Sequence, residues 1–362
     1  MSARKSQESS SSSAFERYAK EQEDLYKELN DIPVDESKTI KTGSVILDAL
    51  ITGTGNGIPA GTSICMSSEP GLGKSTIALG IARKICLAGQ KVIYIDAEKA
   101  VTKYQLETFK LKEFLGKNFI LFQESTFEKV EKILADLIYE PDLACVFIDS
   151  LTTLASERDI DLEESITGGE IASQARLVGK FIKKFRYHSR GAGVTLFFIN
   201  QMRMKDIGAR SGAKMKPAGG LSQEHNMDVH IVINHGDKLY RSEQTALGKQ
   251  DRVVYGEDLK VKCVKNKFCR SGIELVLTLI LGQGVSNYAA YTKWLINHGN
   301  IKQSGPHYTI TINDKTEGLR GQIAVNKFLR DNADMVREYI DANGGFFLVK
   351  NDEQQEANDG ET

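Results

Sequence analysis

Runs of apolar residues recur through the middle of the chain, and each run is followed by a segment whose apolar positions repeat with helical spacing. Strands that are apolar on both faces are typical of a parallel sheet covered by helices, because neither face meets water. The pattern therefore predicts an α/β core with a mostly parallel sheet over residues 40–271. Its predicted strands cover residues 63–66, 91–95, 144–148, 194–199, 229–233 and 259–264.

The residues before this core follow other patterns. Residues 1–13 are rich in serine, and we expect a disordered leader there. Residues 14–39 predict an amphipathic helix and a linker, with apolar side chains at Phe15, Tyr18, Leu25 and Leu29. The apolar stripe of this helix could pack against its own core or against a neighbouring subunit.

The residues after the core alternate between strand and helix patterns, which predicts a small α+β domain over residues 272–350. Its predicted elements are a strand over 273–281, a helix over 288–298, a hairpin arm over 308–312 and an amphipathic helical stretch over 322–342. Residues 351–362 carry five acids and no base, which is typical of a solvated acidic tail.

Composition and charge restrict the class of protein. With 362 residues, of which 41% are apolar, the chain can bury a sizeable core. It has no run of about 20 apolar residues and no signal-peptide core, so we expect a cytoplasmic protein without a membrane partner. The five cysteines are scattered, which favours reduced thiols over disulfides or a zinc site. The formal net charge is −1, so any nucleic-acid binding must rest on local patches.

A glycine-rich turn between the first strand and the following helix has the pattern of a phosphate-binding loop. Its amide groups and the positive helix end would cradle phosphates, Lys74 would add a mobile positive charge, and Ser75 would hold Mg²⁺. The usual pattern has glycine at the first position, where this chain has Ser68. The predicted nucleotide contacts are Ser68, Glu69, Pro70, Gly71, Leu72, Gly73, Lys74, Ser75 and Thr76.

Polar side chains follow the next three predicted strands of the core. Because ligands bind beyond the carboxyl ends of parallel strands, we expect Glu98, Asp149 and Gln201 to lie around one site. Asp149 would support Mg²⁺ through water, Glu98 would orient and deprotonate an attacking water, and Gln201 would sense the γ-phosphate. Together with the phosphate loop, these residues predict an ATPase that uses ATP and Mg²⁺.

Two segments are locally basic. A predicted helix over residues 176–190 has six bases and no acid, and Arg176, Lys180 and Lys183 share one of its faces, which is either a solvated surface or a binding surface. The segment 202–220 holds five bases, one acid and four glycines, and it directly follows Gln201. We expect this predicted loop to close on a phosphate backbone.

These motifs together resemble one family, the bacterial RecA recombinases, over residues 41–342. The strings that carry the resemblance are residues 43–48, 69–76, 95–98, 147–150, 198–205, 219–220 and 261–267. The resemblance implies a RecA-like phosphate-loop ATPase core with an N-terminal helix that docks on the adjacent protomer and a C-terminal domain that gathers duplex DNA. It also implies a helical homo-oligomer on single-stranded DNA, with ATP between protomers, that pairs this strand with homologous double-stranded DNA in recombination and repair.

The resemblance assigns further roles residue by residue. Lys265 and Lys267 are similar to a pair that reaches across the subunit interface to the neighbour's ATP, and Tyr104 is expected to pack on adenine. The predicted catalytic residues are then Lys74, Glu98, Gln201, Lys265 and Lys267. The predicted DNA contacts in two loops and the helix between them are Ile171, Arg176, Lys183, Arg203, Lys205, Arg210, Lys214, Lys216, Gly219 and Gly220.

Some positions depart from the family's pattern and favour a divergent or phage-encoded member. The second DNA loop lacks its aromatic residue, and residues 221–225 lack a Lys-Phe pair that links subunits in the family. These departures keep an alternative open, a nucleotide-binding filament scaffold or recombination accessory protein without strand exchange. A ring helicase uses the same kind of core, but it would present an arginine where this chain has Lys265 and Lys267.

Overall fold

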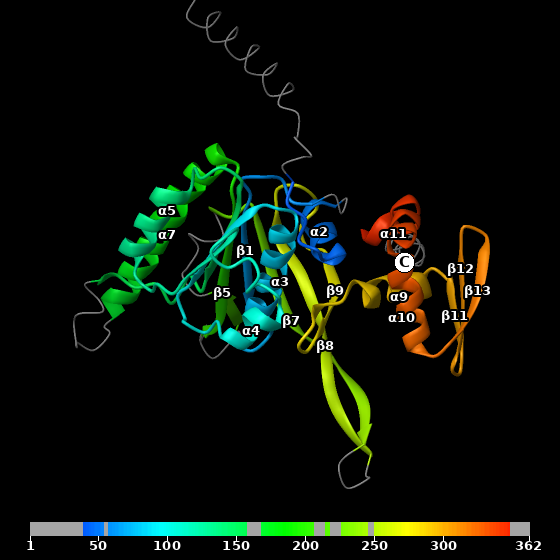
Figure 1. Cartoon of the computed structure of the whole chain (residues 1–362). Helices are drawn as coiled ribbons and strands as arrows, with labels where there is room; N and C mark the ends of the chain where they lie inside the picture. The colour runs from blue at the N-terminus through cyan, green and yellow to red at the C-terminus, as the bar shows by residue number, and fades with distance from the viewer. Residues whose placement is uncertain are drawn as a thin grey trace, which may run out of the picture. The chain divides into compact units, whose positions relative to one another are not determined.

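The computed structural model describes residues 39–53, 57–157, 168–205, 214–217, 226–244 and 250–347 (Figure 1). A single compact unit begins at Ile40. The predicted leader, N-terminal helix and acidic tail lie outside the described residues. In the part of the chain that is described, no helix is both long and apolar enough to cross a membrane.

Among the described residues, ten strands form one large sheet in the order β10-β9-β8-β7-β1-β5-β4-β2-β3, with β6 paired to β5. The six strands from β7 to β3 in this order are parallel, whereas β8, β9, β10 and β6 pair antiparallel to their neighbours. The prediction of an α/β fold with a mostly parallel sheet is confirmed. The strands are β1 Ser63–Ser68, β2 Lys91–Asp96, β3 Phe119–Phe122, β4 Leu143–Asp149, β5 Thr195–Lys205, β6 Lys214–Pro217, β7 Val229–Gln244, β8 Gln250–Asn266, β9 Glu274–Ile280 and β10 Gly284–Val285.

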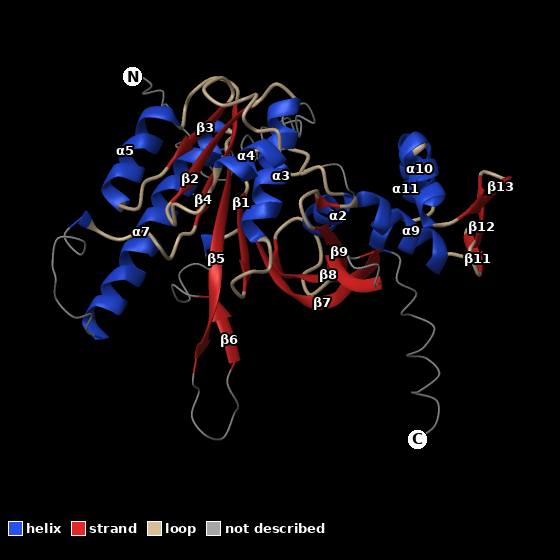
Figure 2. Ribbon diagram, turned by 60° about the horizontal axis from the view of Figure 1, so that its bottom comes forward, coloured by secondary structure: helices blue, strands red, loops and turns tan. Residues whose placement is uncertain are grey.

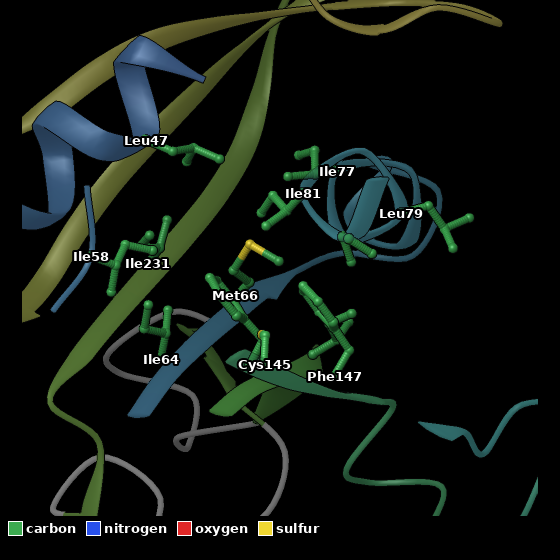
Figure 3. Packing of buried hydrophobic residues seen from close by; sticks show 14 of the residues in the cluster. Leu47, Ile58, Ile64, Met66, Ile77, Leu79, Ile81, Cys145, Phe147 and Ile231 are labelled. Carbon is green, nitrogen blue, oxygen red and sulfur yellow. The ribbon is translucent and has the colours of Figure 1, made fainter. Parts of the chain in front are cut away.

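Helices cover both faces of this sheet, which explains why its central strands are apolar throughout. The helices are α2 Val45–Thr52, α3 Lys74–Leu87, α4 Lys103–Thr108, α5 Phe127–Leu137 and α7 Gly168–Ala192. Helices α2 and α3 pack in one buried cluster together with Ile64 and Met66 of β1. Cys65, between them, belongs to the cluster beneath α5 and α7. Figure 3 shows Ile81 of α3 close to Met66.

Three strand ends differ from the sequence-based expectation. Strand β5 continues beyond its predicted end at residue 199 to Lys205 and pairs there with β6 (Figure 2). Strands β7 and β8 continue as a two-stranded ribbon well beyond their predicted ends at residues 233 and 259. Except where residues 256–258 of β8 pair with β9, the described residues of this ribbon have no further strand beside them and are largely exposed, so they lack the all-apolar pattern that identified the core strands. The four-residue strand β3 was not predicted.

The C-terminal residues form the predicted elements in a different grouping. The strand expected over 273–281 is present as β9, but it pairs with β8 in the large sheet. A separate antiparallel sheet consists of β11 Ile301–Ser304, β12 His307–Ile312 and β13 Lys315–Arg320. It packs with α9 Asn287–Asn297, α10 Gln322–Asp331, α11 Ala333–Ala342 and the short helix η2 Gly345–Phe347. The stretch 322–342 is two helices because Asn332 leaves the helical conformation between them.

Asp48 in α2 is a buried carboxylate whose ionisation affects stability. Its Oδ1 accepts hydrogen bonds from the Thr42 amide at 3.0 Å and the Thr42 hydroxyl at 2.7 Å. Burial nevertheless raises the pKa of Asp48 from 3.8 to about 6. The folded state thus holds this proton more tightly than the unfolded state, so the free energy of unfolding falls as the pH rises from about 4 to about 6 and stays lower above that range.

We expect Asp48→Asn to remove this pH dependence, because the amide oxygen can still accept both hydrogen bonds without a buried charge. Near neutral pH the variant should gain about 1–3 kcal/mol in the free energy of unfolding. Urea unfolding between about pH 4 and pH 8 measures both effects. The matched control is Asp136→Asn on the exposed surface of α5. An unchanged pH profile in Asp48→Asn would contradict the expectation.

Candidate functional site

The predicted phosphate loop lies between the end of β1 and the start of α3, as a strand–loop–helix unit. Gly71 and Gly73 have φ values of 82° and 73°, in the left-handed region that favours glycine. A Cβ at Gly73 would come within 2.4 Å of Leu279 Cδ2 on β9, whereas a Cβ at Gly71 would meet nothing within 4 Å. Gly73 therefore allows the loop to pack on the sheet, and Gly71 faces open space where a ligand can lie.

Lys74 is folded back over this loop. Its Nζ donates hydrogen bonds to the Ser68 hydroxyl at 2.8 Å, the Glu69 carbonyl at 2.9 Å and the Ser68 carbonyl at 3.2 Å. Burial lowers the pKa of Lys74, although the carboxylates of Asp149 and Glu98 act in the opposite direction. The serine that replaces the usual glycine at the loop entrance thus supplies a hydroxyl to the loop lysine.

Asp149, at the end of β4, lies beside the first residues of α3. Its Oδ2 accepts a hydrogen bond from the Tyr94 hydroxyl at 2.7 Å. Burial raises the pKa of Asp149, and hydrogen bonds with Ser75 and Tyr94 oppose that rise. Tyr94 is fully buried in β2 and was not predicted as a site residue; the only signal was one hydroxyl-bearing side chain between the aliphatic residues of the strand.

Glu98 and Gln201 meet at the same edge of the sheet. The Gln201 side-chain amide donates to Glu98 Oε1 at 2.9 Å, and the Thr153 hydroxyl donates to the same oxygen at 3.4 Å. These residues follow or lie within three different strands, so the fold brings together side chains far apart in the sequence. The contact joins the predicted water-activating residue to the predicted γ-phosphate sensor.

Asp96 fixes the turn that carries Glu98. Its carboxylate is buried and accepts hydrogen bonds from the amides of Ala100 at 3.1 Å and Val101 at 2.9 Å, and from the Gln123 side chain at 3.1 Å. Because both oxygens of Asp96 are occupied by these bonds within the fold, Asp96 has a structural role, and Glu98 is the exposed carboxylate of this turn.

The donors around the phosphate loop fit Mg²⁺ in the form in which it accompanies a nucleotide. Within the described ranges, no group of three or more His, Cys, Asp or Glu side chains is arranged to hold a metal ion. Mg²⁺ is usually held by one or two protein oxygens together with substrate phosphates and water. Ser75 and Asp149, which are hydrogen-bonded to each other beside the loop, are the residues that would hold it.

The predicted lysine pair lies at the opposite edge of the sheet from the phosphate loop. Asn266 of β8 pairs with Val229 of β7, which in turn pairs with Ile64 near the start of β1. The loop begins after Ser68 at the other end of β1, about 17 Å away along the strand. Lys267 is therefore too far from the phosphate loop of its own chain to contact a nucleotide there.

Some of the basic side chains on the long helix α7 are exposed and have no ion pair among the described residues, so they can contact DNA, whereas another is paired. Arg176, Lys180 and Lys183 of α7 are exposed, and no ion pair holds them within the described residues. Lys184 binds Glu131 at 2.9 Å. Ile171, expected in the first of the two DNA loops, lies in a helix, because α7 already begins at Gly168.

The predicted second DNA loop is partly a β-ribbon. Arg203 lies opposite Lys216, and Lys205 lies opposite Lys214 in the antiparallel register of β5 and β6. Since cross-strand partners and alternate positions share one face, these four basic positions share a face of the ribbon. The predicted contacts Arg210, Gly219 and Gly220 lie outside the described residues. Tyr104, predicted to pack on adenine, is 72% exposed on α4, and that role stays a prediction.

Comparison with known proteins identifies the family of the chain. The model of the RecA N-terminal domain matches residues 22–286. Protein RecA of Frankia alni is 28% identical over 307 residues, covering 83% of this chain and 81% of that protein. Protein RecA of Paenarthrobacter aurescens is 29% identical over 306 residues, covering 83% and 81%, and that of Borreliella afzelii is 28% identical over 289 residues, covering 79% and 74%. The family model spans well over half of the chain, which therefore belongs to the RecA family as a distant member.

Proposed function

We propose that the chain is a DNA-dependent ATPase that forms helical filaments on single-stranded DNA and catalyses pairing and strand exchange with homologous duplex DNA. The observation that carries the proposal is the separation of the predicted catalytic residues to opposite edges of one sheet. Glu98 and Gln201 lie near the phosphate loop, and Lys267 lies at the far edge. Only a second protomer can supply the missing half, so hydrolysis depends on assembly.

Each residue has a role that its surroundings support. Lys74 can leave the loop carbonyls for phosphate oxygens, since both are hydrogen-bond acceptors. Glu98 accepts a proton from the attacking water and orients it, while Gln201 holds the position of that carboxylate. Bound Mg²⁺ would neutralise charge on the phosphates. The lysines of the neighbouring protomer add positive charge where it develops during phosphoryl transfer.

The arrangement of basic residues supports a nucleic-acid partner. The β5–β6 ribbon is continuous with Gln201, the residue that contacts Glu98: two of its basic positions follow Gln201 on β5, and the other two pair with them from β6. A phosphate backbone bound along this ribbon can therefore influence the Gln201 side chain. Since such contacts are mainly electrostatic, binding should weaken steeply with added salt.

The direct test combines a strand-invasion assay with electron microscopy of the same sample, containing ATP and single-stranded DNA. We expect regular filaments and joint molecules with homologous duplex, and none of the latter with heterologous duplex. Filaments without joint molecules would favour the alternative, a scaffold or accessory protein, which the altered residues 221–225 and the missing loop aromatic suggest. A rate of ATP hydrolysis that is the same with and without DNA would contradict the proposed link between the DNA-binding ribbon and Glu98 through Gln201.

A further inference from the structure

A buried carboxylate outside the predicted site holds the lysine that we assign to the neighbouring nucleotide. Asp228, just before β7, has a fully buried side chain, and its Oδ1 binds Lys267 Nζ at 2.8 Å. The same oxygen binds Arg186 at 2.7 Å and Arg190 at 3.0 Å, both from α7. Its Oδ2 accepts a hydrogen bond from the Ser63 amide at 3.1 Å. Lys267 is therefore bound within its own protomer in this structure.

The Oδ1 atom of Asp228 has more donors than favourable positions for them. A carboxylate oxygen offers about two lone-pair sites, and here three cations share it. Burial raises the pKa of Asp228, but hydrogen bonds from Lys267 and Arg186 outweigh this and hold the pKa below its usual range. The carboxylate thus stays charged, and one cation can leave while the other two keep it paired.

Exposure indicates which cation can leave. The side chain of Arg186 is 20% exposed, whereas those of Lys267 and Arg190 are 43% and 55% exposed. Lys267 and Arg190 can therefore both move into solvent, and they compete for the same oxygen. A stronger ion pair between Arg190 and Asp228 therefore weakens the ion pair between Lys267 and Asp228, and a weaker one strengthens it.

This competition connects Lys267 to a predicted DNA-binding helix. Helix α7 carries Arg190 near its carboxyl end and the exposed bases Arg176 and Lys183 nearer its amino end. A DNA backbone that binds these bases and displaces α7 would change the distance from its arginines to Asp228. At this carboxylate, arginines of α7 and the lysine that follows β8 share a charged contact.

We propose that Asp228 is a positioning residue that stores Lys267 in the isolated protomer and ties its release to DNA binding by α7. This inference rests on the function proposed above, since released Lys267 is useful only to a nucleotide on another protomer. When the arginines of α7 bind the Asp228 carboxylate more strongly, Lys267 dissociates from it and can bind the phosphates of the neighbouring site.

The test uses two variants of the full chain with opposite expected effects. In Asp228→Asn the stored lysine loses its ionic partner. In Arg190→Gln, at an exposed position, Lys267 loses a competitor and is held more firmly. Trace labelling of amines with acetic anhydride, followed by mass spectrometry, reports the accessibility of Lys267 in the protein without DNA. Lys262, an exposed lysine on β8, is the internal control.

We expect labelling of Lys267, relative to Lys262, to rise severalfold in Asp228→Asn and to fall in Arg190→Gln. If neither substitution changes the labelling of Lys267 relative to Lys262, the proposal is wrong. Thermal unfolding of each variant checks the fold. If Asp228→Asn does not fold, Arg190→Gln alone decides, because general damage would raise labelling, whereas the proposal requires it to fall.

Hydrolysis supplies the second readout. Asp228→Asn should hydrolyse ATP severalfold faster than the unchanged protein when DNA is absent, so that the stimulation by DNA is smaller. Arg190→Gln should need more DNA for half-maximal activity. A purely structural role would lower activity in both variants and would refute the proposal. If DNA does not change the rate of ATP hydrolysis by the unchanged protein, the proposed function is wrong. The labelling result still decides whether Asp228 binds Lys267 in the isolated protomer.

Discussion

Replacing Glu98 by glutamine is expected to lower DNA-stimulated ATP hydrolysis by a factor of about 10²–10⁴. The glutamine side chain keeps the size of glutamate and can still accept the hydrogen bond that Gln201 donates to Oε1. It cannot take a proton from the attacking water. Nucleotide binding should stay close to that of the unchanged protein, because Lys74 and the loop amides are untouched.

Steady-state phosphate release and the fluorescence of a labelled ATP analogue measure these two properties separately. The matched control is Glu113→Gln, which removes an exposed carboxylate elsewhere on the core. Hydrolysis near the normal rate in Glu98→Gln would show that another group activates the water. Loss of nucleotide binding in the same variant would mean that Glu98 contributes to the fold of the loop.

A mixture of two inactive variants is expected to recover activity. One variant carries Glu98→Gln, and the other carries Lys265→Ala with Lys267→Ala. Each should lose hydrolysis by about 10³-fold or more, because the first lacks the water-activating carboxylate and the second lacks the lysines supplied in trans. In mixed filaments, roughly one quarter of random interfaces join an intact Glu98 to an intact lysine pair.

The experiment measures ATP hydrolysis on single-stranded DNA as the ratio of the two variants is changed at constant total protein. Activity should be highest near equal amounts and should fall toward both pure samples. A control mixture of Glu98→Gln with Lys74→Ala should stay inactive, because both substitutions affect the same half of the site. No recovery in the first mixture would contradict the assignment of Lys265 and Lys267 to the neighbouring site.

The sequence predicted the parallel core and its phosphate loop because both have local signals. All-apolar runs identify strands that are covered on both faces, and the glycines and Lys74 lie within one short stretch. The apolar pattern also predicted β9, but not that it would join the large sheet, since strand pairing depends on contacts between distant residues. The β5–β6 and β7–β8 ribbons were not predicted, because the apolar pattern identifies only strands that are covered by other elements. A strand exposed to solvent does not need apolar residues.

Asp228 shows the limit of sequence reasoning about the site most directly. It stands alone between Met227 and Val229 and belongs to no motif, and its partners come from residues about 40 positions away on either side. The sequence groups Arg186 and Arg190 with four other bases in one acid-free window, 176–190, and places only Arg176, Lys180 and Lys183 on a shared helical face. The structure shows a separate role for the two arginines, which bind Asp228, while Arg176, Lys180 and Lys183 are exposed.

The placement of the phosphate loop and Lys267 at opposite edges of the sheet also gives an assembly a direction. If each nucleotide needs both edges, the contact between protomers is head-to-tail, and an open chain of such contacts always has one loop and one lysine pair without a counterpart. A chain of n protomers then contains n − 1 complete sites. Short chains should hydrolyse less ATP per protomer than long ones, and the two chain ends should gain and lose protomers at different rates.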